Sequence, residues 1–94
     1  MNEAKHDEAA LRVVALGMDV ERFLESPVGR YLVQRAEAER TAALEDLKDA
    51  NAEDAKAIRA CQHRIGVIDA IQQWLADAMT EGKNAEQQLY EQQE

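Results

Sequence analysis

The stretch Arg64–Met79, RIGVIDAIQQWLADAM, carries the strongest apolar pattern in this 94-residue chain. Large apolar side chains recur along it every three or four residues, which is the spacing of one face of an α-helix. A row of residues separated alternately by three and four positions, here called the heptad row, comprises Ile58, Cys61, Ile65, Ile68, Gln72, Leu75 and Met79. This spacing predicts a helix over about residues 52–81 whose heptad row packs against another helix, as in a coiled coil.

A second apolar row borders the first. This outer row comprises Ala57, Ala60, Val67, Ile71, Trp74 and Ala78. One partner helix covers one row, so two adjoining rows predict a helix that is covered on two sides, within a bundle or across a subunit contact. Trp74 is either a core residue or an anchor for a partner, since tryptophan is enriched at binding hot spots. Gln72 either fixes the register of the helix contact or lies at its edge and reaches water.

The only proline of the chain marks a helix boundary. Ser26 is a good N-cap and Pro27 a good first helical residue, where its missing N–H costs nothing. The boundary predicts a first helix over about residues 3–25 and a second over about 27–49. Gly17 and Gly29 each weaken a helix by about 1 kcal/mol relative to alanine. They either allow close backbone packing or are simply tolerated.

Two further breaks are predicted. The segment KDANAEDAK (residues 48–56) is typical of a turn with a helix restart, for which Asn51 is the expected N-cap. The alternative is one helix that runs straight through. Gly82 is the expected C-cap of the third helix. Asn84 with Gln87 then resembles a capping box for a short final helix over about residues 85–92.

These elements predict one all-α domain over residues 1–94, built on an elongated antiparallel hairpin of the second and third helices. A 30-residue helix is about 45 Å long, and such a thin hairpin leaves apolar flanks uncovered. We therefore expect a bundle formed by dimerisation. The expected interface comprises Val28, Tyr31, Leu32, Val33, Ile58, Ile65, Val67, Ile68, Ile71, Gln72, Trp74, Leu75 and Met79.

Composition and charge exclude several function classes. The net charge of −8 argues against direct binding to nucleic acid, which needs clustered Lys and Arg. No apolar run approaches the ~18 residues of a membrane span, and the charged start MNEAKHDEAA lacks the apolar centre of a signal peptide. A single cysteine fits a reducing cytosol. We expect a soluble protein with neither a membrane nor nucleic acid as its partner.

No chemistry-bearing constellation is present in the sequence. Cys61 and His63 are two residues apart on a helix and point about 200° away from each other, so they do not share a metal ion. The Glu-x-x-His at Glu3–His6 is one half of a di-iron pattern without its second half. Phosphate-binding and nucleophile motifs are also missing. We expect no enzyme activity, no metal and no cofactor.

The strings FLESPVGRYLVQRAEAERTAALEDL (residues 23–47) and IQQWLADAMTEGKNAEQQL (residues 71–89) resemble small helical proteins of tailed bacteriophages and prophages. The shared pattern is a Phe-Leu-x-Ser before a Gly-Arg-Tyr-Leu helix, an Arg-Ala-Glu run, and a Trp-Leu helix followed by an Ala-Glu-x-x-Leu tail. About half of the chain carries this resemblance. It implies a phage or prophage origin and a helical fold, and it transfers no catalytic residue.

Two functions are therefore expected from the sequence. The first is a non-enzymatic protein that self-associates and docks on a larger phage assembly such as the virion head, connector or packaging apparatus. The alternative is a phage-encoded regulator or inhibitor that binds a host protein, for instance as an acidic mimic of nucleic acid. Either function places the protein in the cytoplasm of a bacterial host, and the first allows it to be part of the virion.

Overall fold

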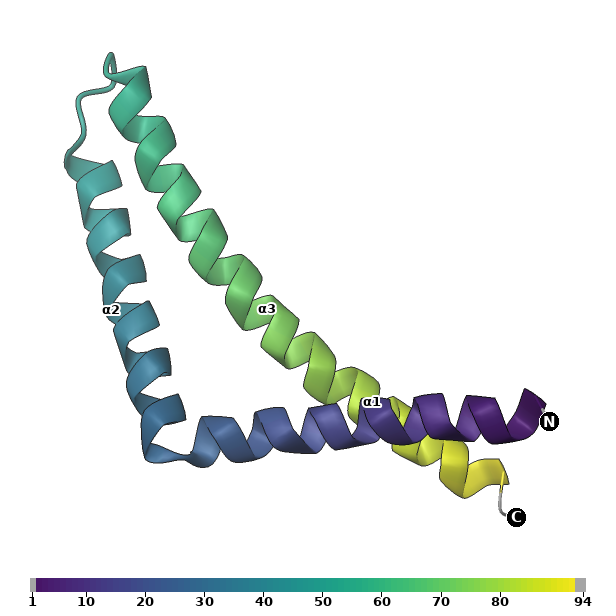
Figure 1. The fold of residues 1–94 in the computed structure, drawn as a ribbon. Helices are drawn as coiled ribbons and strands as arrows, with labels where there is room; N and C mark the ends of the chain where they lie inside the picture. The colour runs from purple at the N-terminus through teal and green to yellow at the C-terminus, as the bar shows by residue number, and fades with distance from the viewer. Residues whose placement is uncertain (1, 93–94) are drawn as a thin grey trace.

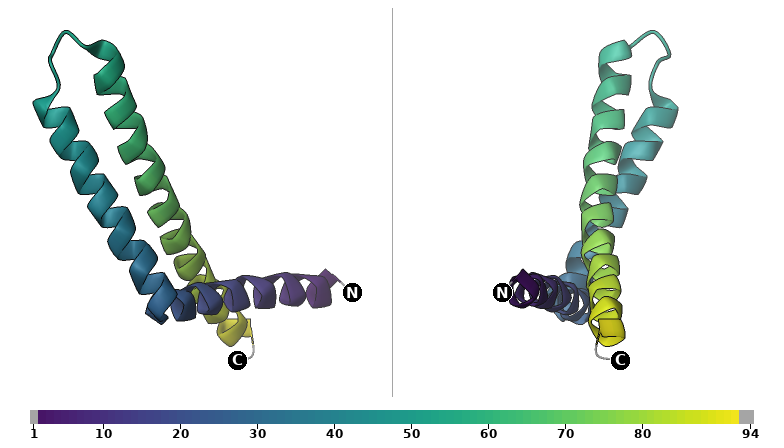
Figure 2. Two further views of the ribbon diagram at one scale, coloured as in Figure 1. Left: turned by 60° about the vertical axis from the view of Figure 1, so that its left-hand side comes forward. Right: turned by 90° about the vertical axis from the view of Figure 1, so that its right-hand side faces the viewer.

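The computed structural model describes residues 2–92, with side chains from Asp7 to Gln92. These residues form three helices, α1 (Asn2–Glu25), α2 (Pro27–Asp49) and α3 (Ala55–Gln92), which confirms the all-α class and the bounds of the first two helices. From the turn at residues 50–54, α2 and α3 run side by side and then spread apart toward α1 (Figure 1). Near the end of the chain α1 crosses α3 and packs on one side of it (Figure 2).

The corner between α1 and α2 forms as the Ser26-Pro27 pair predicts. The Ser26 hydroxyl accepts a hydrogen bond from the Gly29 N–H at 3.0 Å, and Pro27 is the first residue of α2. A side chain on Gly29 would overlap the backbone of Phe23 and Leu24 at the end of α1. Gly29 therefore allows close backbone packing at this corner.

The turn between α2 and α3 confirms the predicted break, but a different residue caps α3. The Asn51 side chain accepts from the Glu53 N–H at 3.0 Å and so stabilises the turn itself. The Asp54 carboxylate accepts from the Ala57 N–H at 3.1 Å, which is the N-cap interaction. The third helix consequently begins at Ala55 and not near residue 52.

The predicted end of the third helix at Gly82 is wrong, and so is a separate helix over residues 85–92. The helix α3 runs through Gly82 without interruption to Gln92. Gly82 is buried against α1, where a Cβ atom would lie 3.1 Å from the Gly17 Cα and 3.2 Å from the Val13 carbonyl oxygen. The absence of side chains at Gly17 and Gly82 therefore allows α1 and α3 to pack closely.

The three helices enclose almost no core. The radius of gyration is 19.1 Å, whereas a compact chain of this length has about 12 Å. The accessible surface is 7594 Å², while a compact protein of this mass exposes about 5,500 Å². Among the described residues with apolar side chains, only Ala43 and Cys61 are buried. The chain by itself therefore leaves about 2,000 Å² more surface in water than a compact fold would.

Candidate interaction surface

The heptad row of α3 is the face that this chain covers with its own helices. Cys61 of α3 is 7% exposed and Ala43 of α2 is 0% exposed, and the remaining members of the row are half-buried. The predicted interface residues in this row, Ile58, Ile65, Ile68, Gln72, Leu75 and Met79, therefore lie at least partly against α2 and α1. Small side chains at the contact allow the two helices of the hairpin to approach closely.

The large side chains of the outer row of α3 are exposed, while Ala57 and Ala78 of that row are half-buried. Val67, Ile71 and Trp74 are 44%, 47% and 66% exposed. The interpretation of Trp74 as a core residue is therefore wrong for the single chain, because two thirds of its surface is in water. Its role as an anchor for a partner stays a prediction.

The predicted interface residues at the start of α2 also differ in exposure. Val28, Tyr31 and Leu32 are exposed, and Val33 is half-buried. Tyr31 lies about 100° around the helix from Leu32, so it belongs to another side of α2. Val28 and Leu32 are one turn apart and form a continuous apolar edge beside the corner.

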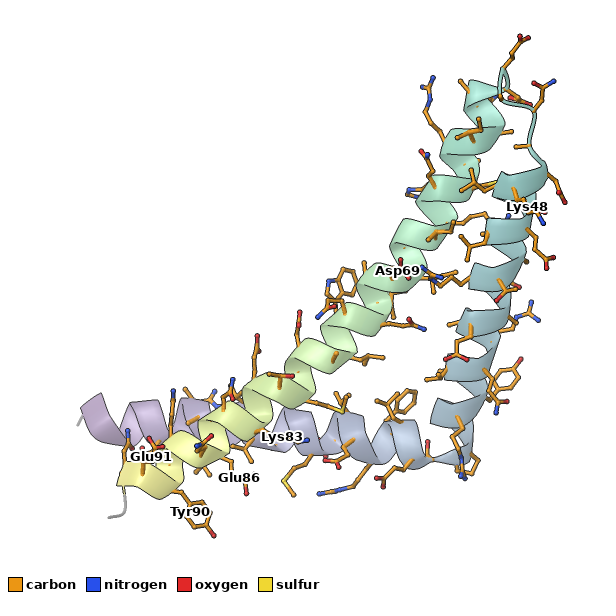
Figure 3. All side chains as sticks on the ribbon, turned by 180° about the vertical axis from the view of Figure 1, so that it is seen from behind. Lys48, Asp69, Lys83, Glu86, Tyr90 and Glu91 are labelled. Atoms are coloured by element: carbon orange, nitrogen blue, oxygen red, sulfur yellow. The ribbon has the colours of Figure 1, made fainter. Side chains whose placement is uncertain are left out.

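Ion pairs between α2 and α3 show which rows of the two helices share one side of the hairpin. Arg64 of α3 donates to the Asp46 carboxylate at 2.9 Å, and its other amino group lies 3.8 Å from Glu39. On the opposite side, Arg40 of α2 makes a two-point contact with Asp69, at 2.7 and 3.4 Å. Figure 3 shows Asp69 on α3 beside α2.

Helical spacing shows which other residues lie on the same side of the hairpin as the Arg64 ion pairs. Residues that lie three, seven or ten positions after Arg64 share its side of α3, and they are Val67, Ile71 and Trp74. Leu32 lies seven positions before Glu39 and shares its side of α2. We call the surface formed by Val28, Leu32, Val67, Ile71 and Trp74 the apolar face of the hairpin.

The other side of the hairpin is polar. Three hydrophilic side chains share the side of Asp69 on α3, because they lie seven positions before it, four after it and eleven after it, namely Gln62, Gln73 and Thr80. The Arg40 hydrogen bond and charge lower the pKa of the Asp69 carboxyl group and hold it ionised. The Asp69 hydrogen bond likewise raises the pKa of Arg40. This face is suited to contact with water.

Charged groups at the apolar face pair with one another. Arg35 lies 2.9 Å from Glu39, which also contacts Arg64, and Arg64 binds Asp46. Hydrogen bonding to Asp46 raises the pKa of Arg64. These two cations and two anions thus balance one another.

The crossing of α1 and α3 is acidic. From Asp7 to Glu25 there are five acidic and two basic side chains, and from Asp77 to Gln92 there are four acidic and one basic. The fold brings these two segments, which are far apart in the sequence, to the same end of the molecule. The first three turns of α3, residues 55–64, have the opposite character, with three basic and no acidic side chains.

A shallow groove lies at the crossing. Its apolar lining comprises Val14, Met18 and Met79. Its charged lining comprises Glu21, Lys83 and Glu86, and Figure 3 shows the last two near the crossing. No serine, cysteine or histidine is among the described residues that line the groove, so we assign it no chemistry.

The described residues contain no group of three His, Cys, Asp or Glu side chains suited to a metal ion. The predicted half-motif at Glu3–His6 lies outside the described side chains. None of the helices in residues 2–92 is long and apolar enough to cross a bilayer. Comparison with protein-family models, curated proteins and solved structures found no match to this chain.

Sequence reasoning did not identify the partner of α1 or the ion pairs of the hairpin. The partner of α1 is the second half of α3, and Gly17 was the only signal of that contact. The ion pairs join residues that are 18 to 29 positions apart. Arg40 and Asp69 were detectable only after the register of α2 against α3 was known.

Proposed function

We propose that this chain is a non-enzymatic protein that acts by binding protein, first to itself and then to a larger assembly. The observation that carries the proposal is the exposure of Val67, Ile71 and Trp74 on one row of α3, together with that of Val28 and Leu32 on α2. Large exposed apolar patches on helical proteins are typical of protein–protein contacts.

The amount of uncovered surface supports a stable contact. The chain exposes about 2,000 Å² more than a compact fold of its mass. A standard protein interface buries about 800 Å² on each partner, and obligate dimers bury more than that. Burial of only half of the surplus surface therefore provides a contact of ordinary size.

The resemblance of residues 23–47 and 71–89 to small proteins of tailed bacteriophages gives the assembly its proposed identity. We propose that the dimer docks on the virion head, the connector or the packaging apparatus, in the cytoplasm of the bacterial host or in the virion. The charge-balanced hairpin serves self-association in this proposal.

A specific observation favours a second candidate function. The acidic segments of α1 and of the second half of α3 meet at one end of the molecule. Such an end suits a basic protein surface, as expected for a phage-encoded regulator that binds a host protein in place of nucleic acid. This candidate predicts binding to a purified basic host protein that weakens as salt rises.

The self-association part is tested by light scattering on the purified chain across a wide range of concentrations. We expect a mass of at least twice 10.6 kDa together with a helical circular dichroism spectrum. A folded species of 10.6 kDa at all concentrations would contradict it. For the docking part, purified phage heads, connectors and packaging proteins are each tested for binding to the labelled protein, and binding to none of them would contradict that part.

A further inference from the structure

We infer that the apolar face of the hairpin docks against the same face of a second copy, in an antiparallel arrangement that places the tip of each hairpin beside α1 of the other chain. The inference rests on the proposed self-association and adds to it the surface, the symmetry and the orientation. Five side chains carry the contact, namely Val28, Leu32, Val67, Ile71 and Trp74.

The architecture of the hairpin requires a second layer on one side only. Between the turn and α1, the hairpin is a single layer of two helices, and a helical layer buries side chains only when another layer covers it. One side carries Val67, Ile71 and Trp74 in water, while the other carries Gln62, Asp69 and Gln73. Covering the apolar side alone buries Val67, Ile71 and Trp74 and leaves the polar side to solvent.

Charge favours a second copy as the occupant. The ionic groups at the apolar face, Arg35, Glu39, Asp46 and Arg64, are paired within the chain. Groups that are already paired in this way meet their own copies with little like-charge repulsion, and a two-fold axis then repeats every contact. A differently charged partner would gain nothing from this face electrostatically.

The distribution of charge along the molecule favours the antiparallel orientation. The acidic crossing end would meet a second acidic end in a parallel dimer, at a cost in repulsion. In the antiparallel dimer, the acidic α1 of one chain lies beside the basic first turns of α3 in the other, which carry Lys56 and Arg59. The described side chains make no ion pair with either of these two residues.

The position of α1 sets the register of the two chains. Gly82, which contacts α1, lies 18 residues after Arg64, and 18 residues make five full turns of an α-helix. Therefore α1 lies on the same side of α3 as Val67 and Ile71, as a ledge at one end of the apolar face. The face extends from the ledge at Gly82 to the start of α3 at Ala55 over about 40 Å. In the antiparallel dimer, each hairpin therefore lies between α1 of its own chain and α1 of the other chain.

The surface is tested by the same substitution at two nearby positions on opposite sides of α3. Ile71→Glu places a charge in the proposed contact, while Gln73→Glu places the same charge on the polar side. We expect Ile71→Glu to weaken dimerisation at least about 30-fold, because buried anchors contribute 2 kcal/mol or more, and Gln73→Glu to change it less than about threefold. Trp74→Gln, at a position 66% exposed in the single chain, provides a second test that does not disturb the fold.

Light scattering measures the dimerisation of each variant, and circular dichroism checks that each variant is folded. A monomeric wild type would remove the proposed self-association together with this inference. A dimeric wild type with equal dimerisation of the Gln73→Glu and Trp74→Gln variants would overturn the inference alone. In the wild type, the emission of Trp74, the only tryptophan, is expected to shift to shorter wavelength as the concentration rises through the dimer dissociation constant.

The orientation is tested by cross-linking a mixed dimer of isotopically labelled and unlabelled chains. A zero-length carboxyl–amine reagent is expected to join Lys56 of one chain to an α1 carboxylate of the other. A link between the two Lys56 side chains by an amine-specific reagent would indicate the parallel dimer. Either that result or the absence of any link between chains would overturn the antiparallel orientation.

Discussion

The tip of the hairpin and the crossing of α1 with α3 both bring two helices close together, but by different means. At the tip, Ala43 and Cys61 provide small side chains, and the ion pairs of Arg40 and Arg64 hold α2 and α3 on both sides. At the crossing, Gly17 meets Gly82 with backbone against backbone, and the described side chains form no ion pair between α1 and α3. The crossing therefore depends on two missing Cβ atoms, while the tip distributes its stability over several interactions.

The strongest test of this difference is Gly82→Val. The new side chain would meet the Gly17 Cα and the Val13 carbonyl oxygen at 3.1 and 3.2 Å, and neither backbone atom has room to move without displacement of α1. We expect a loss of about 3 kcal/mol from overpacking, seen as a lower urea midpoint for unfolding.

Gly66→Ala is the matched control on the same helix. No atom lies within 4 Å of a Cβ placed on Gly66, so alanine is expected to stabilise α3 by about 0.5–1 kcal/mol through its higher helix propensity. Equal effects of Gly82→Val and Gly66→Ala would show that the crossing does not depend on close backbone contact.

A smaller effect is expected at the tip. Ala43→Leu adds three carbon atoms at a position that is 0% exposed, but the hairpin is open at its base and can spread. We expect a loss of about 1–2 kcal/mol in the same urea experiment. Ala42→Leu, at the exposed neighbouring position, is expected to change stability by less than about 0.5 kcal/mol. A loss at Ala43 larger than that at Gly82 would reverse the comparison.

The smallest effect concerns the ion pair on the polar face. The pKa of Asp69 is lowered in the folded chain by the Arg40 hydrogen bond, so its stabilising effect is present above the unfolded value of about 3.9 and disappears as the pH falls through the lower folded value. Asp69→Asn is expected to be slightly less stable than the wild type at pH 7 and to approach it below about pH 4. Urea midpoints are measured for both proteins at both pH values and at one protein concentration. A difference in stability between the two proteins that does not change with pH would contradict this prediction.

Local signals in the sequence were sufficient for much of the fold. The Ser26-Pro27 pair fixes the start of α2 because an N-cap and a first-turn proline act within four residues. The spacing of the heptad row likewise identified the most covered side of α3. Both signals depend on backbone geometry that neighbouring residues determine by themselves.

The errors arose where a distant contact decides the outcome. Glycine is typical of a helix C-terminus, but α1 packs against Gly82 and the helix continues. Asn51 and Asp54 are both good caps, and the choice between them depends on how the turn closes. The apolar face was identified only in part, because its α2 half requires the register that Arg64 sets with Glu39 and Asp46.

The burial of Cys61 gives the hairpin a built-in reporter. It is the only cysteine of the chain, it is free and buried, and it belongs to the heptad row of α3 that the chain itself covers. Opening of the hairpin is expected to expose the thiol to an alkylating reagent, so the rate of modification is expected to rise with the frequency of opening under native conditions. That rate follows the internal motion of a single chain without any added label.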